Sequence, residues 1–227
     1  MPVSSQSEFW SGVRAELPIL VGVAPFGMIY GVLALGAGLP PAQAQAMSSV
    51  VFAGSAQFMT VQLVAASAPA AVIVLTVLVI NLRHALYSAS IAPYLARLSP
   101  AWKGLLAYLL TDEAYAASNT HYQSQPVSQA RPWFLLGAGL ALWTGWQIST
   151  AVGVFLGAQV PAAWSLDFTL ALTFIALVIP AVKDRAALLA ALVAGVTAVL
   201  TYGLPYKLGL IVSALAGILA GMAGERK

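Results

Sequence analysis

Long apolar runs, separated by short polar connections, dominate this chain of 227 residues. A membrane-spanning helix needs about 20 mainly apolar residues. The runs are too long for strands, and they do not alternate between apolar and polar residues. The pattern predicts an all-α polytopic membrane protein with about eight transmembrane helices, at residues 17–38, 43–66, 70–95, 102–121, 132–158, 163–181, 186–203 and 205–223.

The second of these segments is too polar to face lipid on all sides. It contains Gly54, Ser55 and Gln57 among many other small and polar residues. Two interpretations stay open. The segment is a small-residue helix packed against its neighbours, or it is broken or re-entrant at Gly54 and Ser55, with free backbone groups facing a cavity.

Composition agrees with a membrane location. Hydrophobic residues make up 60% of the chain and charged residues only 7%, whereas a soluble domain has about 25% charged residues. The net charge of +3 is spread over loops and helix ends, so it does not indicate nucleic-acid binding. The absence of cysteine excludes disulfides and thiol chemistry.

Residues 1–16 lack the pattern of a cleavable signal peptide, and we expect them to form an interfacial segment before a single transmembrane domain at 17–227. Two weakly similar halves, at about 17–121 and 132–223, are indicated because "GAGLPPAQAQ" (36–45) resembles "GAQVPAAWSL" (157–166). Parallel halves of this kind occur in transporters. Chance similarity is the alternative.

Positive charges in short loops predict the orientation of the chain. With eight spans and a cytoplasmic N-terminus, six basic residues lie inside and three outside. Those inside are Arg14, Arg131, Lys183, Arg185, Arg226 and Lys227, and those outside are Arg97, Lys103 and Lys207.

Arg83 lies about thirteen residues into the segment 70–95. A charge at this depth costs about 2.5 kcal/mol or more, and arginine stays protonated. Its compensation must come from a carboxylate, a water-filled cavity or an anionic ligand. Tyr87 shares a helix face with Arg83, and Asn81, His84 and Ser88 form a second polar stripe. His84 is either a proton carrier or a hydrogen-bonded core imidazole.

The next segment carries the carboxylates. Asp112 and Glu113 lie about ten residues into 102–121, and Asn119 shares a helix face with Asp112. One interpretation is a structural ion pair between Arg83 and one of these acids. The other is a transport site, since ionisable residues inside membranes usually line substrate or proton paths. We expect His121 to lie in a loop, and two histidines so far apart do not indicate a metal site.

Three motifs resemble those of a known family. "FAGSAQFM" (52–59), "NLRHALYSAS" (81–90) and "LTDEAYA" (110–116) are similar to signature stretches of the AzlC/YgaZ family, whose members are the large subunits of branched-chain amino-acid exporters. The resemblance spans most of the chain and includes "LVIPAVKDR" near 177–185.

The resemblance implies a permease of the plasma (inner) membrane that exports valine, leucine, isoleucine and often methionine, driven by the proton-motive force. It also implies a small AzlD-type membrane partner and no cofactor. Intramembrane enzyme motifs are absent from the sequence. An importer, a transporter of another small zwitterion and a non-transporting scaffold subunit are the alternatives. The expected substrate-binding or coupling residues are Arg83, Asp112, Glu113, Gln57, Asn81, His84, Tyr87, Ser55, Gly54 and Asn119.

Overall fold

The computed structural model describes residues 4–124, 129–158, 182, 184–205 and 208–225. Within these ranges every regular element is a helix and no strand occurs, which confirms the predicted all-α class. Contacts divide the chain into two compact units. Residues 1–61 with 77–161 form the first unit, and residues 62–76 with 162–227 form the second.

Four of the described helical segments are long and apolar enough to cross a membrane: α1 (Ser5–Gly36), α4 with its 3-10 extension (Ala70–Leu95), α7 (Arg131–Gly157) and α10 (Leu208–Glu225). A shorter apolar helix, α9, spans Arg185–Leu200. The protein is therefore a multi-pass membrane protein. The count of eight spans stays a prediction, and the expected span 163–181, with the second copy of the proposed repeat, lies outside the described residues.

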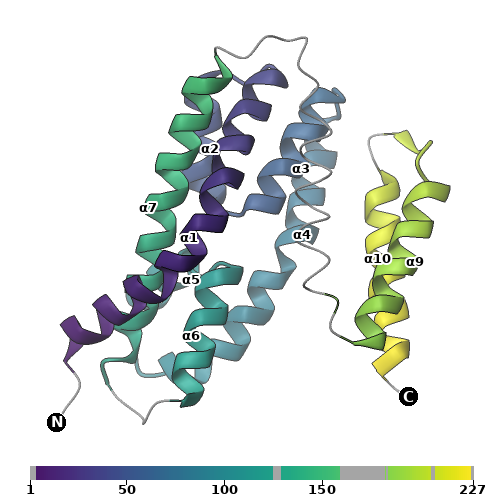
Figure 1. The fold of residues 1–227 in the computed structure, drawn as a ribbon. Coiled ribbons are helices and arrows are strands. Elements are labelled where there is room, and N and C mark those ends of the chain that lie inside the picture. The colour runs from purple at the N-terminus through teal and green to yellow at the C-terminus, as the bar shows by residue number, and fades with distance from the viewer. Residues whose placement is uncertain (1–3, 125–128, 159–181, 183, 206–207, 226–227) are drawn as a thin grey trace. The chain divides into compact units, whose positions relative to one another are not determined.

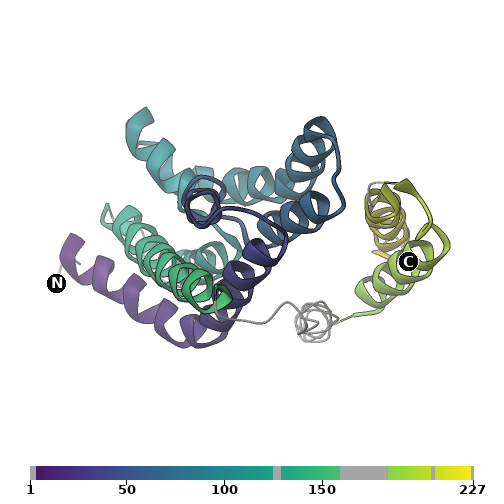
Figure 2. The same cartoon turned by 90° about the horizontal axis from the view of Figure 1, so that it is seen from above.

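The first unit is organised around α1 and α7, which lie side by side (Figures 1 and 2). Glycines allow this contact. A Cβ at Gly12 would clash with the backbone of Phe134, and one at Gly153 with the backbone of Met28. Small residues let helix backbones approach closely where lipid supplies no hydrophobic driving force between helices. The contacts advance together along both helices, so α1 and α7 run parallel.

This parallel pairing constrains the topology. Between two parallel spans the chain must cross the membrane an odd number of times. Helix α4 is long enough to supply one crossing. The segments 43–66 and 102–121, before and after α4, must then either both cross the membrane or both re-enter. A single re-entrant segment at 43–66 is therefore incompatible with the fold.

The segment 43–66 is broken, as one interpretation of its sequence predicted. Helix α2 spans Pro41–Val51 and α3 spans Gly54–Ala65. Between them Phe52 has φ 40° and ψ 47°, a left-handed conformation that is an outlier for a bulky residue. Its buried ring packs against Tyr108, with 5.9 Å between ring centroids. This packing holds the break in place.

The predicted span 102–121 is also broken, whereas we expected one continuous helix. Helix α5 spans Pro100–Tyr108 and α6 spans Asp112–Ser124. The physical reason is a helix-start signal at Thr111. Its hydroxyl accepts a hydrogen bond from the backbone N–H of Ala114 at 3.4 Å, as an N-cap does, and two acids follow in the first turn, where the helix dipole favours negative charge.

The expected interfacial segment at 1–16 is continuous with the first span, since α1 begins at Ser5. Whether it lies at the membrane surface stays a prediction. In the second unit α9 and α10 pair along small residues. Gly217 faces Ala190 and Ala194, and Gly224 faces Ala186, so this pair is antiparallel (Figure 1).

Replacing Gly153 with alanine should destabilise the protein. The new methyl group would meet the backbone of Met28, and forced overpacking costs about 1–3 kcal/mol. The measurement is the free energy of unfolding in detergent. Gly22→Ala is the control, because no atom lies within 4 Å of its Cβ position. Equal stability of the two variants would contradict the packing described for α1 and α7.

Replacing Thr111 with valine should remove the cap of α6 and lower the free energy of unfolding by about 1 kcal/mol. Thr120→Val is the matched control, because the Thr120 hydroxyl bonds only the carbonyl of Ala116 within the same helix. Thermal unfolding of both variants in detergent measures the difference. If Thr120→Val is the more damaging change, Thr111 does not fix the start of α6.

Candidate functional site

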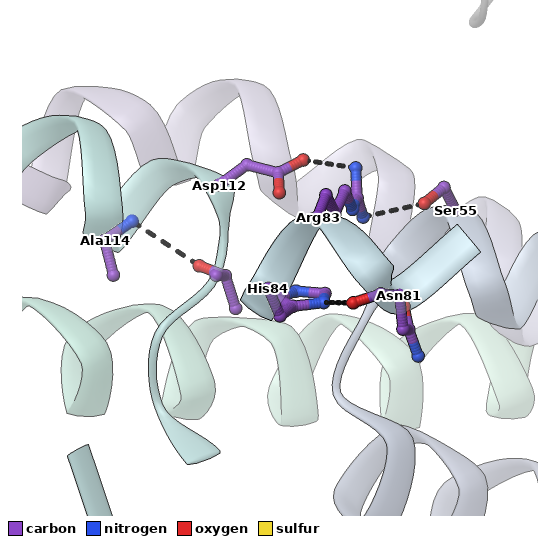
Figure 3. Close-up of polar contacts among 7 residues, drawn as sticks. Ser55, Asn81, Arg83, His84, Asp112 and Ala114 are labelled. Carbon is purple, nitrogen blue, oxygen red and sulfur yellow. Dashed lines mark hydrogen bonds and ion pairs between the residues drawn. The ribbon is translucent and has the colours of Figure 1, made fainter. Parts of the chain in front are cut away.

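Arg83 joins the starts of the two half-helices α3 and α6 (Figure 3). Its Nη1 donates to Asp112 Oδ2 at 2.6 Å, and its Nη2 donates to Ser55 Oγ at 2.7 Å. The expected ion pair is therefore present, and Asp112 is the acid that forms it. The side chains of Arg83 and Asp112 are 29% and 40% exposed, so the pair is reachable from outside the packed core.

The two helix breaks lie next to each other because aromatic side chains connect them. Tyr108, at the end of α5, contacts Phe52 at the end of α2. Its hydroxyl donates to the carbonyl oxygen of Ser49 and accepts from Trp143 Nε1 at 2.7 Å. Helix α7 thus anchors both breaks through Trp143. The first backbone N–H groups of a helix lack intrahelical acceptors, and the side chains of Ser55 and Asp112, in the first turns of α3 and α6, bind the guanidinium group.

Several polar atoms of this site are buried without a hydrogen-bond partner among the described residues. They are Arg83 Nε, Asp112 Oδ1, Asn81 Oδ1 and Gln57 Nε2. Most buried polar groups in proteins are hydrogen-bonded, and an unpaired one costs about 1–3 kcal/mol. The set contains donors and acceptors, including one atom from each member of the ion pair. A ligand with both kinds of group would satisfy them.

Aromatic side chains form one wall of the site. Tyr87 lies beside Asp112, and its ring stacks on Tyr115 with 4.6 Å between centroids. The rings of His84 and Tyr87 form a T-shaped contact with 5.9 Å between their centroids. His84 Nδ1 lies 3.3 Å from the carbonyl oxygen of Asn81. Figure 3 shows Asn81 and His84 on the same helix as Arg83, with His84 Nδ1 beside the Asn81 carbonyl oxygen.

Helix α7 also holds α3 from the opposite side. Trp146 Nε1 donates to Gln57 Oε1 at 3.1 Å, and the Trp146 ring stacks on Tyr30. A Cβ at Gly54 would lie 3.2 Å from Trp146 Cη2, so the glycine lets the indole cover the helix break. Gln147, next in the chain, accepts from Gln45 Nε2 at 2.8 Å and thereby fixes α2.

An apolar cavity of about 200 Å³ opens between α4, α5 and α7. Its lining begins at Ser88 on α4, five residues after Arg83, and includes Leu110, two residues before Asp112. The rest of the lining is mainly aliphatic, with Ile91, Leu95, Leu106, Ala107 and Leu135, and it also includes Lys103, whose Nζ bonds the carbonyl oxygen of Ala96. The cavity is therefore close in sequence to both members of the ion pair.

One predicted site residue lies apart from Arg83: Asn119 Oδ1 accepts from Gln123 Nε2 at 3.2 Å, toward the far end of α6. Glu113 interacts electrostatically with Arg83 and with Glu16 of α1. The prediction that His121 lies in a loop is wrong. It belongs to the last turns of α6, and its Nε2 lies 2.8 Å from Glu8 Oε2.

Sequence reasoning missed Glu16, which is fully buried on α1. Because residues 1–16 are predicted to be interfacial, the sequence predicts Asp112 and Glu113 as the acids deep in a span. A signal was present: Glu8, Gly12 and Glu16 recur every four residues, which places them on one helix face. Thr111, followed by two acids, was a second missed signal.

The family model described as AzlC protein matches residues 18–160. The inner membrane protein YgaZ of Escherichia coli is 27% identical over 82% of this chain and 78% of its own length. An uncharacterized membrane protein of Archaeoglobus fulgidus is 31% identical over 81% of this chain and 80% of its own.

The branched-chain amino acid transport protein AzlC of Bacillus subtilis is 27% identical over 78% of this chain and 70% of its own length. No solved structure matches the chain. The matched region contains α2 to α7 completely and residues 18–36 of α1, and therefore the environment of Arg83. The chain belongs to the AzlC family.

Proposed function

We propose that the protein is a secondary transporter that exports branched-chain amino acids across the plasma membrane. The observation that carries this proposal is the position of Arg83 between Ser55 and Asp112, with unpaired donor and acceptor atoms left over. The printed name of the relative from Bacillus subtilis supports the substrate class. The proton-motive force drives export, a small AzlD-type subunit assists it, and the N-terminus is cytoplasmic.

The polar groups of the site match a zwitterionic amino acid. Arg83 Nε is a free donor for the substrate carboxylate, for which arginine geometry is well suited. The starts of α3 and α6 add positive dipole ends. Asp112 Oδ1 is a free acceptor for the ammonium group, and the face of Tyr87 can take part by a cation–π contact. Both charges of the substrate are thereby met.

The aliphatic side chain of the substrate enters the cavity lined by Ile91, Leu106 and Leu110. Such a pocket favours aliphatic side chains, because their burial removes apolar surface from water. It discriminates weakly among valine, leucine, isoleucine and methionine, because one methylene group changes binding by only about 1–3 kcal/mol. This accounts for a substrate class in place of a single substrate.

The other residues support the binding groups. Gly54 and Ser55 form the start of α3 that approaches the guanidinium, and Gln57 offers its unpaired Nε2. Asn81 and His84 line the opposite side, on the helix of Arg83. Since the ends of broken helices carry these groups, small displacements of α3 or α6 would open the site to either side of the membrane.

Arg83→Lys should reduce leucine efflux from proteoliposomes that contain the chain and its small partner. Lysine keeps the charge, but it cannot reach Ser55 and Asp112 and also present a free donor in the fixed geometry of guanidinium. Loss of a hydrogen bond to a charged group is worth about 1.5–3 kcal/mol, which corresponds to a decrease of about 10- to 100-fold.

Arg97→Lys is the matched control, because Arg97 is exposed and lies beyond α4. We expect it to transport at the normal rate. Normal efflux by Arg83→Lys would refute the role of Arg83. Absence of leucine, valine, isoleucine and methionine flux in the folded unmodified protein with its partner would refute the proposed function itself.

Ala107→Leu should change which substrate is preferred. Ala107 lines the apolar cavity, and a larger residue there leaves less room for a long aliphatic side chain. The preference for valine over leucine should rise by about tenfold or more. Competition between labelled valine and leucine measures this ratio. Ala101→Leu on the same helix is the control, and an unchanged ratio in Ala107→Leu would contradict this use of the cavity.

A further inference from the structure

A second set of ionisable groups lies between α1 and α6, away from the Arg83 guanidinium. Glu8, Gly12 and Glu16 form the buried face of α1 in this region. Glu8 Oε2 lies 2.8 Å from His121 Nε2, and Glu16 interacts electrostatically with Glu113. The position increases by eight residues along α1 and decreases by eight along α6, so the two helices are antiparallel here and their ionisable groups pair in register.

Glu16 has the most unusual environment of this set. Its side chain is 0% exposed, and neither carboxyl oxygen has a hydrogen-bond partner among the described residues. An ionised carboxylate without a partner cannot be buried at an acceptable free energy, and such a group becomes protonated instead. The structure therefore gives Glu16 a neutral form as its resting state.

The surroundings of Glu16 contain no compensating cation within the described residues. The neighbouring group on α6 is another acid, Glu113. The only charged residue of α7 is Arg131, at its start, where the guanidinium lies over the rings of Tyr94 and Tyr122. Helix α2 has no titratable residue. His121 is engaged with Glu8.

The polar groups continue between the two pairs. Ser118 lies on α6 between Glu113 and His121 along the helix axis, it is 0% exposed, and its Oγ has no partner among the described residues. At the other end Glu113 follows Asp112 directly in the chain. Polar and ionisable residues therefore occur along α6 from the Glu8–His121 pair to the Arg83–Asp112 pair. Chains of acids and histidines form proton relays in membrane pumps and transporters.

We propose that Glu16, with Glu113 as a neighbouring acid, is the site where the transporter binds its coupling proton. This inference rests on the proposed function. Glu16 is buried without a hydrogen-bond partner among the described residues, and a nearby acid further disfavours its ionised form, so it holds the proton until a movement of α1 or α6 exposes it to the side that accepts the proton. The proton is taken from water on one side and released to water on the other, and no covalent bond changes.

Charge on these two acids would link proton release to substrate binding. Arg83 interacts electrostatically with Glu113 as well as with Asp112. When the proton leaves, a further negative charge appears near Asp112 and attracts the ammonium group of the substrate. Proton release thus favours amino-acid binding, and proton binding favours amino-acid release, as export driven by an inward flow of protons requires.

Infrared spectroscopy of the full chain with its partner in lipid tests the site without transport. The unmodified protein should show the carbonyl band of a protonated carboxylic acid that disappears as the pH is raised. Glu16→Gln should lose this band, whereas Glu113→Gln should keep it, because Glu16 stays buried and unpaired in that variant. Glu8→Gln is the matched control on the same face of α1, and it should keep the band. A missing band, or a band unaffected by Glu16→Gln, would overturn the proposal.

A sodium ion is the competing occupant, because carboxylates and the Ser118 hydroxyl are hard oxygen ligands. Loss of the band on addition of sodium at constant pH would overturn the proton assignment. Transport then tests coupling. Glu16→Gln should keep leucine–leucine exchange, which needs no gradient, and lose the stimulation of efflux by an imposed pH gradient.

Retained pH-gradient stimulation in Glu16→Gln would contradict coupling through this pair. Failure of the proposed function gives a different result, since the unmodified protein would then move no leucine while its infrared band still depended on Glu16. Retention of the band in both Glu113→Gln and Glu8→Gln, together with its loss in Glu16→Gln, assigns the proton to Glu16.

Discussion

The permanent charge of Arg83 is the constraint on which the first unit depends. A guanidinium in a membrane segment costs several kcal/mol unless it is compensated, and here Asp112 and Ser55 compensate it at 2.6 and 2.7 Å. Both groups stand at the start of a half-helix. Each start exists because a membrane-length segment is interrupted, so one charge is compensated at two breaks in the fold.

The remainder of the unit keeps these interrupted segments in position. Helices α1 and α7 are in close backbone contact through glycines such as Gly12 and Gly153. From this frame, Trp143 and Trp146 reach Tyr108 and Gln57, which belong to the two broken segments. Packing against α7 supports the site, whereas the unpaired polar groups on α3 and α6 leave it open to a charged ligand.

The sequence predicted the parts of the fold that depend on rare residues or on average hydropathy. The all-α class, the Arg83 ion pair and a break at Gly54 followed in this way. The break before Asp112 was not predicted. Leu109 and Leu110 keep this stretch apolar, although the Thr111 cap starts a new helix there. Glu16 was missed because burial of a terminal helix face depends on α6 and α7, which no local pattern contains.

A structure of the chain with its small partner in lipid and saturating leucine would test the central claim most directly. The account predicts leucine density between Arg83 and Asp112, with the carboxylate toward Arg83 Nε, the ammonium toward Asp112 Oδ1 and the side chain toward Leu110. Leucine bound elsewhere, with the Arg83–Asp112 pair unchanged and out of contact, would show that the pair is only structural and would contradict the account.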